Sequence, residues 1–315
     1  MRQIKPNSQQ PEFEAHVMTS KPIPESAVSV LAISGADAAS LLQGQLTNDV
    51  MHLERCWQHT GLCNPKGRLF SALRLWRHEG TFYALLPAEL ANVIAQRLQM
   101  FVLRSKVEIA VLHTPPATFY PDLRSLQSLQ HIEFNNLQAN AVVIDDERHL
   151  MFDDDVCLEL DLSDAASASQ QLDGWLEHHI ERGQPWLSAA LSEQFVPQMV
   201  NLDLVEGINF KKGCYTGQEI VARMHYLGKL KQRMFVCDWQ DSTAVASAYC
   251  ASELIGHRIV STESGDATVG TIVCVAPQSS RALAVLRIAN KDENLRLKDG
   301  PKLQIAETQP YDVTV

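Results

Sequence analysis

The feature that most constrains the fold is a change in residue patterning near residue 235. Before it, runs typical of strands alternate with runs that have the spacing of amphipathic helices. Beyond it, only short apolar runs of strand type follow, at residues 234–239, 258–261, 269–275 and 281–288. Short strands separated by turns at this spacing are typical of a small sandwich or barrel. We therefore predict an α+β body over residues 26–235 and a separate β-rich unit over residues 236–315.

The body is predicted to follow a loose N-terminal arm, residues 1–25, which holds four prolines. Strand patterns occur at residues 28–33, 69–75, 81–86, 141–144 and 156–162, and helical patterns at 36–46, 88–102 and 165–181. The aspartates at positions 153–155 are predicted to form a solvated turn. His178 and His179 are neighbours and cannot share one helix face, so we predict no metal site there.

The composition excludes some classes of protein. The formal net charge of −10 argues against a protein that coats nucleic acid or anionic lipid through its overall field. No run approaches the ~18 apolar residues of a membrane span, and the N-terminus lacks an apolar secretory segment. Seven cysteines without a C-x-x-C pair suggest neither a disulfide framework nor a zinc site. We expect a cytoplasmic protein with no membrane contact.

The segment Lys212-Gly213-Cys214-Tyr215-Thr216-Gly217-Gln218-Glu219 carries the most chemistry. Thr216 and Glu219 fit a capping box, which predicts a helix from Gly217. Cys214 would then lie just ahead of the positive helix end, where Lys211 and Lys212 would also stabilise a thiolate. This setting suits a reactive cysteine, but a packed loop cysteine explains the same pattern equally well.

Basic residues gather around this segment. From residue 209 to 234 the single acid is Glu219, and the pattern predicts a positive patch suited to carboxylate, phosphate or RNA, or else a solvated face. The basic residues of this stretch are Lys211, Lys212, Arg223, Lys229, Lys231 and Arg233.

The segment at 212–219 resembles the signature of the YgfZ family of folate-binding proteins. Residues 42–50, 64–68, 104–107 and 198–202 also resemble family segments in the expected order, so the resemblance covers nearly the whole chain from residue 27. The family is similar in fold to the T-protein of the glycine cleavage system, a tetrahydrofolate-dependent aminomethyltransferase. The resemblance implies two interleaved subdomains around a central folate channel in the body and a C-terminal β-barrel.

The resemblance also implies a function. The chain would be a folate-binding accessory protein that supports iron-sulfur enzymes and tRNA modification, including thiomethylation, with tetrahydrofolate or a derivative as its cofactor. Its partners would be the iron-sulfur enzymes of tRNA thiomethylation, with a weak tRNA contact through the patch from Lys211 to Arg233.

One departure bears on enzymatic activity. T-proteins carry two aspartates on the strand after the glycine-containing turn, and this chain has Ser71 and Ala72 there. Neither can replace an ionised carboxylate, so we do not expect glycine-cleavage transfer. The alternative is a folate-dependent one-carbon transferase, moving an aminomethyl or methyl group to an unknown acceptor.

The resemblance assigns site residues. Cys214 would act as the thiol, with Lys212 and Arg223 tuning its charge or holding the folate tail. Trp175 would stack on the pterin, although a core position on its helix is as good an explanation. Asn48, Asp49 and Lys66 could reach the folate, although a capping or turn role explains each equally well. The signature residues that join this folate-binding set are Tyr215, Gln218 and Glu219.

Overall fold

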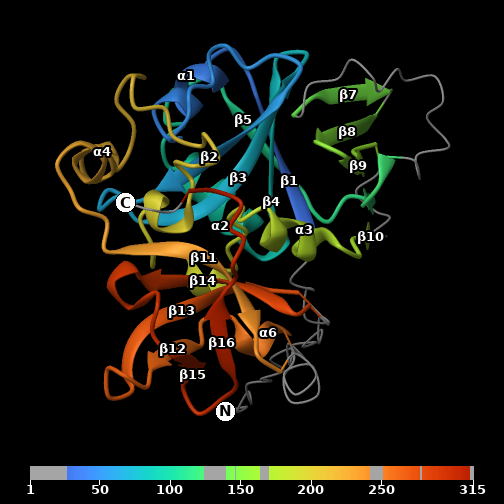
Figure 1. The fold of residues 1–315 in the computed structure, drawn as a ribbon. Coiled ribbons are helices and arrows are strands. Elements are labelled where there is room, and N and C mark those ends of the chain that lie inside the picture. Colours follow the sequence, from blue (N-terminus) through green and yellow to red (C-terminus); the bar gives the residue numbers. More distant parts are fainter. Residues whose placement is uncertain are drawn as a thin grey trace, which may run out of the picture.

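The structure is a computed structural model that describes residues 27–123, 140–145, 147–163, 170–241, 251–276 and 279–312. The predicted arm at residues 1–25 lies outside these ranges. The described chain forms two five-stranded sheets and a closed barrel, with the barrel below the sheets in Figure 1. The predicted α+β class with a C-terminal β-barrel is confirmed.

The first sheet has the strand order β2-β3-β4-β1-β5. Its strands are β1 (Val28–Ser34), β2 (Trp57–Cys63), β3 (Leu69–His78), β4 (Thr81–Pro87) and β5 (Glu108–Leu112). The two residues that join β3 to β4, Glu79 and Gly80, both have positive φ, as the tight turns favoured in hairpins require. Side chains alternate between the two faces of each strand, so this sheet can contribute to two cores.

Helices α1 (Ala38–Gln43) and α2 (Ala91–Gln99) cover one face of this sheet. Leu42, Ile94 and Leu98 from these helices pack on Leu31 and Ile33 from β1. Both helices are shorter than predicted, and a 3-10 turn, η1 (Ala88–Leu90), forms the start of the predicted second helix.

The second sheet has the order β10-β6-β9-β8-β7 and lies to the right in Figure 1. Its strands are β6 (Ala117–Tyr120), β7 (Val142–Asp145), β8 (Arg148–Asp153), β9 (Val156–Asp161) and β10 (Gln170–Gln171). Helix α3 (Trp175–Glu181) follows and packs against barrel strands β13 and β14. The predicted helix over 165–181 is therefore wrong at residues 170–171, where the chain is a strand, and residues 164–169 lie outside the described ranges. Gly174, at φ 83°, is the N-cap residue just before α3.

The barrel closes in the order β11-β14-β13-β12-β15-β16. Its elements are β11 (Gln232–Trp239), α6 (Ala251–Leu254), β12 (Arg258–Ser261), β13 (Ala267–Val275), β14 (Arg281–Arg287), η7 (Ile288–Asn290), β15 (Leu295–Leu297) and β16 (Lys302–Ile305). Strands lie at each of the four predicted positions, whereas β15 and β16 are too short to give a clear pattern.

After β16 the chain runs back toward the body. Ala306 donates its amide to the carbonyl of Val236 at 2.9 Å. Pro310 and Tyr311 then pack on Gly183, just beyond α3, where a β-carbon would lie 2.7 Å from Pro310 Cγ. This tail thus joins the barrel to the body.

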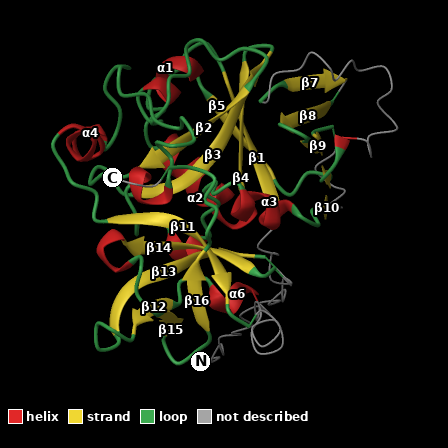
Figure 2. Cartoon of the chain, in the orientation of Figure 1, coloured by secondary structure: helices red, strands yellow, loops and turns green. Residues whose placement is uncertain are grey.

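The remaining elements connect the body to the barrel. They are η5 (Ala189–Leu191), η6 (Pro197–Val200) and α4 (Gln218–Tyr226). Figure 2 shows strands through the middle of the molecule and α4 on its outer left side. Helix α4 therefore borders solvent, and its buried residue is Val221.

Candidate functional site

The segment at residues 209–217, which we call the cysteine loop, is fixed at both ends. Thr216 donates its amide to the carbonyl of Gly44 at 3.2 Å, and Asn209 donates its amide to the carbonyl of Thr47 at 3.0 Å. The side-chain oxygen of Asn209 accepts the amides of Lys211 at 2.8 Å and Lys212 at 3.0 Å, as in an Asx turn. These hydrogen bonds hold the cysteine loop against residues 44–47.

Lys212 clamps the cysteine loop from within. Its side chain is buried, and Nζ donates to the carbonyls of Leu46 at 2.8 Å and Asn48 at 2.7 Å. Nζ also lies 5.3 Å from the centre of the Tyr215 ring. Burial lowers the pKa of Lys212 to about 8, against the opposing charge of Asp49. In the structure the ammonium group of Lys212 is used for these two backbone carbonyls, and its role in tuning the thiol or holding a folate tail stays a prediction.

The end of the cysteine loop packs against the turn at residues 64–68. A β-carbon on Gly217 would lie 2.5 Å from the carbonyl oxygen of Asn64 and 3.0 Å from the Cα of Gly67. The side-chain oxygen of Asn64 accepts the amides of Lys66 at 2.9 Å and Arg68 at 3.0 Å, which shapes this turn. The two segments therefore meet backbone to backbone.

The predicted capping box is wrong. Helix α4 begins at Gln218 after Gly217, whose φ of 84° is left-handed, and no side chain caps its first turn. Thr216 instead donates its hydroxyl to the side-chain oxygen of Gln45 at 3.0 Å. Glu219 pairs with Arg223 at 3.0 Å on the exposed face of α4. Arg223 thus forms a surface ion pair worth about 1 kcal/mol or less, and its role toward the thiol or the folate stays a prediction.

Cys214 lies on the outer side of the cysteine loop and is exposed. Among the described cysteines, Cys56 is half-buried and the others are buried. Burial raises the pKa of Cys63 to about 12, so that thiol is held protonated. The one exposed thiol of the described chain thus sits on a loop held by a buried lysine. The buried cysteines are Cys63, Cys157, Cys237 and Cys274.

The predicted folate contacts near residue 48 have turn roles in the structure. Asn48 donates its side-chain amide to the carbonyls of His59 at 2.9 Å and Glu206 at 2.8 Å. Asp49 accepts the amide of Met51 at 2.9 Å. Asn48, Asp49, Lys212 and Tyr215 are thus brought together, whereas Trp175 belongs to a different part of the molecule.

The predicted basic patch is smaller than its sequence range. Arg233 is buried and makes two hydrogen bonds of 3.0 Å to the carboxylate of Asp203, and Lys212 is buried as described above. Arg223 pairs with Glu219. The exposed lysines of the patch are Lys211, Lys229 and Lys231.

Trp175 lies in the shared core of the body and barrel, with 0% exposure. Its ring meets Phe119, His179 and Trp186 edge-on at 4.3 to 5.5 Å between centroids. The guanidinium carbon of Arg74 lies 4.8 Å from the centre of this ring and 4.5 Å from the centre of the Trp57 ring. Trp175 therefore occupies the core position that was the alternative to pterin stacking.

A buried polar cluster surrounds the Arg74 guanidinium. Nη2 of Arg74 lies 3.2 Å from Asp153 Oδ2 and donates to Gln184 Oε1 at 2.6 Å. His178 Nε2 lies 2.8 Å from the same Asp153 oxygen. Burial favours the neutral acid, but the His178 hydrogen bond and the Arg74 charge outweigh it, so the pKa of Asp153 lies well below its usual range. We call Arg74, Asp153, His178, His179 and Gln184 the Arg74 cluster.

This cluster corrects the prediction that residues 153–155 form a solvated turn. Asp153 is buried, while Asp154 and Asp155 pair with Arg182 nearer the surface. Sequence reasoning missed Arg74, although a lone arginine within the apolar run 69–76 is a pattern that could have revealed it. Ser71 and Ala72, in place of the T-protein aspartates, are buried in β3 on the same strand.

The surroundings of Trp175 can be compared with the needs of a folate. Five buried N–H donors have no hydrogen-bond acceptor among the described residues, and three of them lie in and around Trp175: Arg74 Nε, Trp175 Nε1 and Trp186 Nε1. The guanidinium carbon of Arg74 lies 4.8 Å and the ring centre of Trp186 lies 5.4 Å from the centre of the Trp175 ring. Buried donors without acceptors are costly, and the heterocycle of a pterin carries acceptor atoms. The donor chemistry fits a pterin, provided that the contacts that enclose Trp175 can open.

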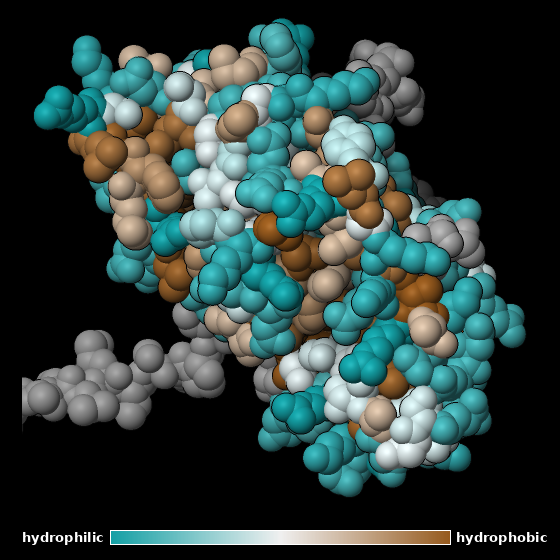
Figure 3. Space-filling view, turned by 90° about the vertical axis from the view of Figure 1, so that its left-hand side faces the viewer, coloured by the Kyte–Doolittle hydropathy of each residue, from teal (hydrophilic) through white to brown (hydrophobic). Residues whose placement is uncertain are grey.

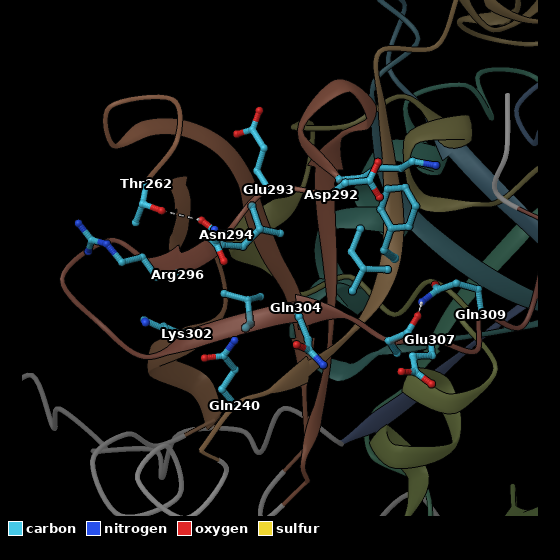
Figure 4. A pocket seen from close by; sticks show the side chains of 16 residues that line it. Gln240, Thr262, Asp292, Glu293, Asn294, Arg296, Lys302, Gln304, Glu307 and Gln309 are labelled. Carbon is cyan, nitrogen blue, oxygen red and sulfur yellow. Dashed lines mark hydrogen bonds between the residues drawn. The ribbon is translucent and has the colours of Figure 1, made fainter.

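A pocket of about 830 Å³ lies elsewhere, over barrel strands β15 and β16. Figure 4 shows side chains of both charges around it, including Glu293, Arg296, Lys302 and Glu307. None of the predicted site residues lines it. In the described residues, no three His, Cys, Asp or Glu side chains form a group that could hold a metal ion. None of the described helices is long and apolar enough to cross a membrane.

The fold is similar to that of known proteins. The fold is that of the glycine cleavage aminomethyltransferases: aminomethyltransferase T from Bartonella henselae superposes with a TM-score of 0.65 over 91% of this chain and 84% of that chain, at 14% identity. The predicted T-protein-like fold is confirmed. No protein-family model matches the chain.

Curated relatives share more of the sequence. The tRNA-modifying protein YgfZ of Vibrio vulnificus is 35% identical over 252 residues, which are 72% of this chain and 75% of the relative. YgfZ of Klebsiella pneumoniae is 34% identical over 66% of this chain and 68% of the relative, and that of Serratia proteamaculans is 29% identical over 90% of each chain. The chain belongs to the YgfZ family, as its motifs predicted.

Proposed function

We propose that this protein binds tetrahydrofolate or a derivative and supports iron-sulfur enzymes and tRNA modification, including thiomethylation, in the cytoplasm, with Cys214 as a reactive thiol. The observation that carries the proposal is the exposure of Cys214 on a loop fixed by buried Lys212. Relatives named as tRNA-modifying proteins support the link to tRNA. The aminomethyltransferase fold is consistent with a folate ligand.

The folate would bind where Trp175 and the Arg74 cluster meet. Its heterocycle would take hydrogen bonds from the unpartnered N–H groups of Trp175, Trp186 and Arg74, and the indole of Trp175 would stack on it once the neighbouring rings move apart. The bound folate would supply or accept a one-carbon unit, while these residues hold and orient it.

Folate binding is tested by titrating the full chain with 5-formyltetrahydrofolate and following tryptophan fluorescence. We expect saturable binding, weakened about tenfold in Trp175→Phe, equivalent to about 1.4 kcal/mol. Trp239→Phe, in the barrel core, is the matched control and should bind as the wild type does. Absence of saturable binding to the wild type would remove folate from the proposal.

The thiol is tested in a strain that lacks the gene. Cys214→Ser should fail to restore iron-sulfur enzyme activity and tRNA thiomethylation, whereas Cys56→Ser, at a half-buried cysteine, should restore both. In native protein, iodoacetamide should modify Cys214 before the buried cysteines. Full restoration by Cys214→Ser would show that the thiol is not needed.

The transferase alternative is favoured by the fold and disfavoured by Ser71 and Ala72, which supply no carboxylate. Incubating purified protein with 5,10-methylenetetrahydrofolate and measuring loss of the one-carbon unit decides between the two. Turnover without a partner protein would favour the transferase.

A contact with tRNA is also part of the proposal. The exposed lysines Lys211, Lys229 and Lys231 would carry it, and the burial of Arg233 and Lys212 removes those two from the predicted patch. Binding through so few charges should be weak and should fall steeply with salt.

A further inference from the structure

Three aromatic rings meet where the cysteine loop passes the last turn of α4. Phe210 and His225 stack in parallel, with ring centroids 3.7 Å apart and planes 13° apart. Tyr226 stands edge-on to both, 4.7 Å from His225 and 6.2 Å from Phe210. His225 and Tyr226 are exposed, and Tyr226 shows 63% of its surface. We call Phe210, His225 and Tyr226 the α4 ring cluster.

The packing of α4 does not account for this exposure. The helix is anchored through Val221, on its buried side, while Tyr226 and the next residue, Leu227, point to solvent. Large apolar or aromatic side chains gathered on a surface are more often a binding site than a packing device. Figure 3, which views the side of the molecule that carries α1 and α4, shows brown apolar patches between teal polar residues.

Positive charge surrounds the ring cluster. Lys211 follows Phe210 directly in the cysteine loop, and Lys229 and Lys231 follow Tyr226 in the link to β11. All three are exposed and form no ion pair with any residue that the structure describes. The sequence has no acid from residue 220 to 237, although the whole chain carries a net charge of −10. This surface is therefore positive although the protein as a whole is negative, and it favours an anionic partner.

We propose that the α4 ring cluster and its three lysines bind single-stranded RNA, with an unpaired base stacked on the rings and the lysines on the phosphates. Every nucleobase has a flat face that stacks on aromatic side chains, and lysines near the stack hold the backbone. The choice of RNA as the nucleic acid rests on the proposed function in tRNA modification. A duplex hides its bases, so it could use the lysines but not the rings.

An acidic protein segment and an RNA differ in which side chains they would use. An acidic protein segment would use the lysines and the apolar Leu227, which is 86% exposed beside the rings. A base would gain from the flat rings of His225 and Tyr226, and Leu227 offers it no such face. Leu227→Ala is therefore a matched control for Tyr226→Ala, one position away on the same surface.

The test uses the full chain and a fluorescein-labelled 12-nucleotide single-stranded RNA, with anisotropy measured between 50 and 200 mM salt. A duplex of the same sequence is the comparison. We expect tighter binding of the single strand, and binding weakened about fivefold or more in His225→Ala and Tyr226→Ala through the lost stack. Their salt dependence should stay that of the wild type, because stacking releases no counterions. Leu227→Ala should bind as the wild type does.

Substitution of the lysines should instead change the salt dependence of binding. Lys229→Gln with Lys231→Gln should lower the slope of log K against log salt by about 1.4, or about 0.7 for each lost phosphate contact. The altered α4 residues are exposed, and circular dichroism checks that each variant is folded. Equal binding of duplex and single strand, or no effect of Tyr226→Ala, would overturn the stacking proposal. A loss in Leu227→Ala alone would show that apolar contact rather than stacking on the rings drives binding, and would overturn it as well.

The folate and RNA proposals can fail separately. Tyr226→Ala should bind 5-formyltetrahydrofolate as the wild type does, because Trp175 lies in the core, away from the exposed end of α4. If the wild type binds the RNA and no folate, the folate proposal fails alone. If it binds folate and no RNA at 50 mM salt, the RNA proposal fails alone.

Discussion

The Cα of Gly217 faces the carbonyl oxygen of Asn64 so closely that a β-carbon on Gly217 would lie 2.5 Å from that oxygen. Gly67 completes the contact from the other loop, since a β-carbon there would lie 2.7 Å from the Cβ of Ile220. Two motifs far apart in sequence therefore interlock through their backbones. A side chain at either glycine would force them apart.

Substitution of Gly217 should be costly. Gly217→Ala places a β-carbon at φ 84° and against the Asn64 carbonyl, so we expect a loss of at least about 2 kcal/mol in the free energy of unfolding. Gly213→Ala is the matched control, because no atom lies within 4 Å of the added carbon, and should change stability by about 0.5 kcal/mol or less. Urea unfolding measures both, and equal losses would contradict the interlock.

Lys212 should stabilise the cysteine loop through its side chain. Lys212→Met removes the hydrogen bonds to the carbonyls of Leu46 and Asn48 and leaves both without that donor, so we expect a loss of about 2–4 kcal/mol. Lys211→Met, at the exposed neighbour, should be nearly neutral. Denaturant midpoints and limited proteolysis of residues 209–217 check the pair. If residues 209–217 were as resistant to proteolysis in Lys212→Met as in the wild type, the stabilising role of the Lys212 side chain would be contradicted.

Asp153 should matter more than the adjacent Asp154. Asp153→Asn leaves the buried guanidinium of Arg74 without its counter-charge, which we expect to lower stability by about 3–5 kcal/mol. Asp154→Asn breaks an exposed pair with Arg182 and should cost about 1 kcal/mol or less. Thermal unfolding of the two variants under the same conditions tests the difference, and equal melting temperatures would contradict the buried ion pair.

Acid should destabilise the fold before its carboxylates are protonated. Burial, aided by the charge of Arg74, lowers the pKa of His59 to about 3, and burial, aided by His78, lowers that of His149 to about 4. The unfolded chain binds these protons near pH 6.5 and the folded chain does not, so stability is full above about pH 6.5 and falls toward pH 4. The slope is about 1.4 kcal/mol per pH unit for each histidine.

One of these histidines can be replaced without losing its hydrogen bond. His149 Nδ1 accepts the indole N–H of Trp76 at 2.9 Å, and His149→Gln can offer an amide oxygen instead. In urea unfolding between pH 4.5 and 6.5, the free energy of unfolding of His149→Gln should fall less steeply toward acid than that of the wild type, by the contribution of one proton. His52→Gln, at an exposed histidine, is the matched control. An unchanged slope in His149→Gln would mean that His149 does not contribute.

Local patterns predicted the strands better than the site. The apolar runs at 28–33, 69–75 and 81–86 and the four barrel runs form strands, because alternation of buried side chains is written into neighbouring residues. The capping role of Thr216 was wrong, and the hydrogen bonds of Lys212 were not foreseen, because their partners at residues 45–48 are distant in sequence. Asp153 was assigned to solvent for the same reason, since Arg74 reaches it from another sheet.

The contact of Tyr311 with Gly183 joins the last described residues of the chain to the body. Tyr311 lies near enough to Asp153 and Arg74 that burial, with the Asp153 charge, raises its pKa to about 12. The ribosome delivers this residue after the whole body and barrel, so a nascent chain reaches that stage without its tail in place. The contact of the tail with Gly183 therefore forms only after translation has passed Tyr311.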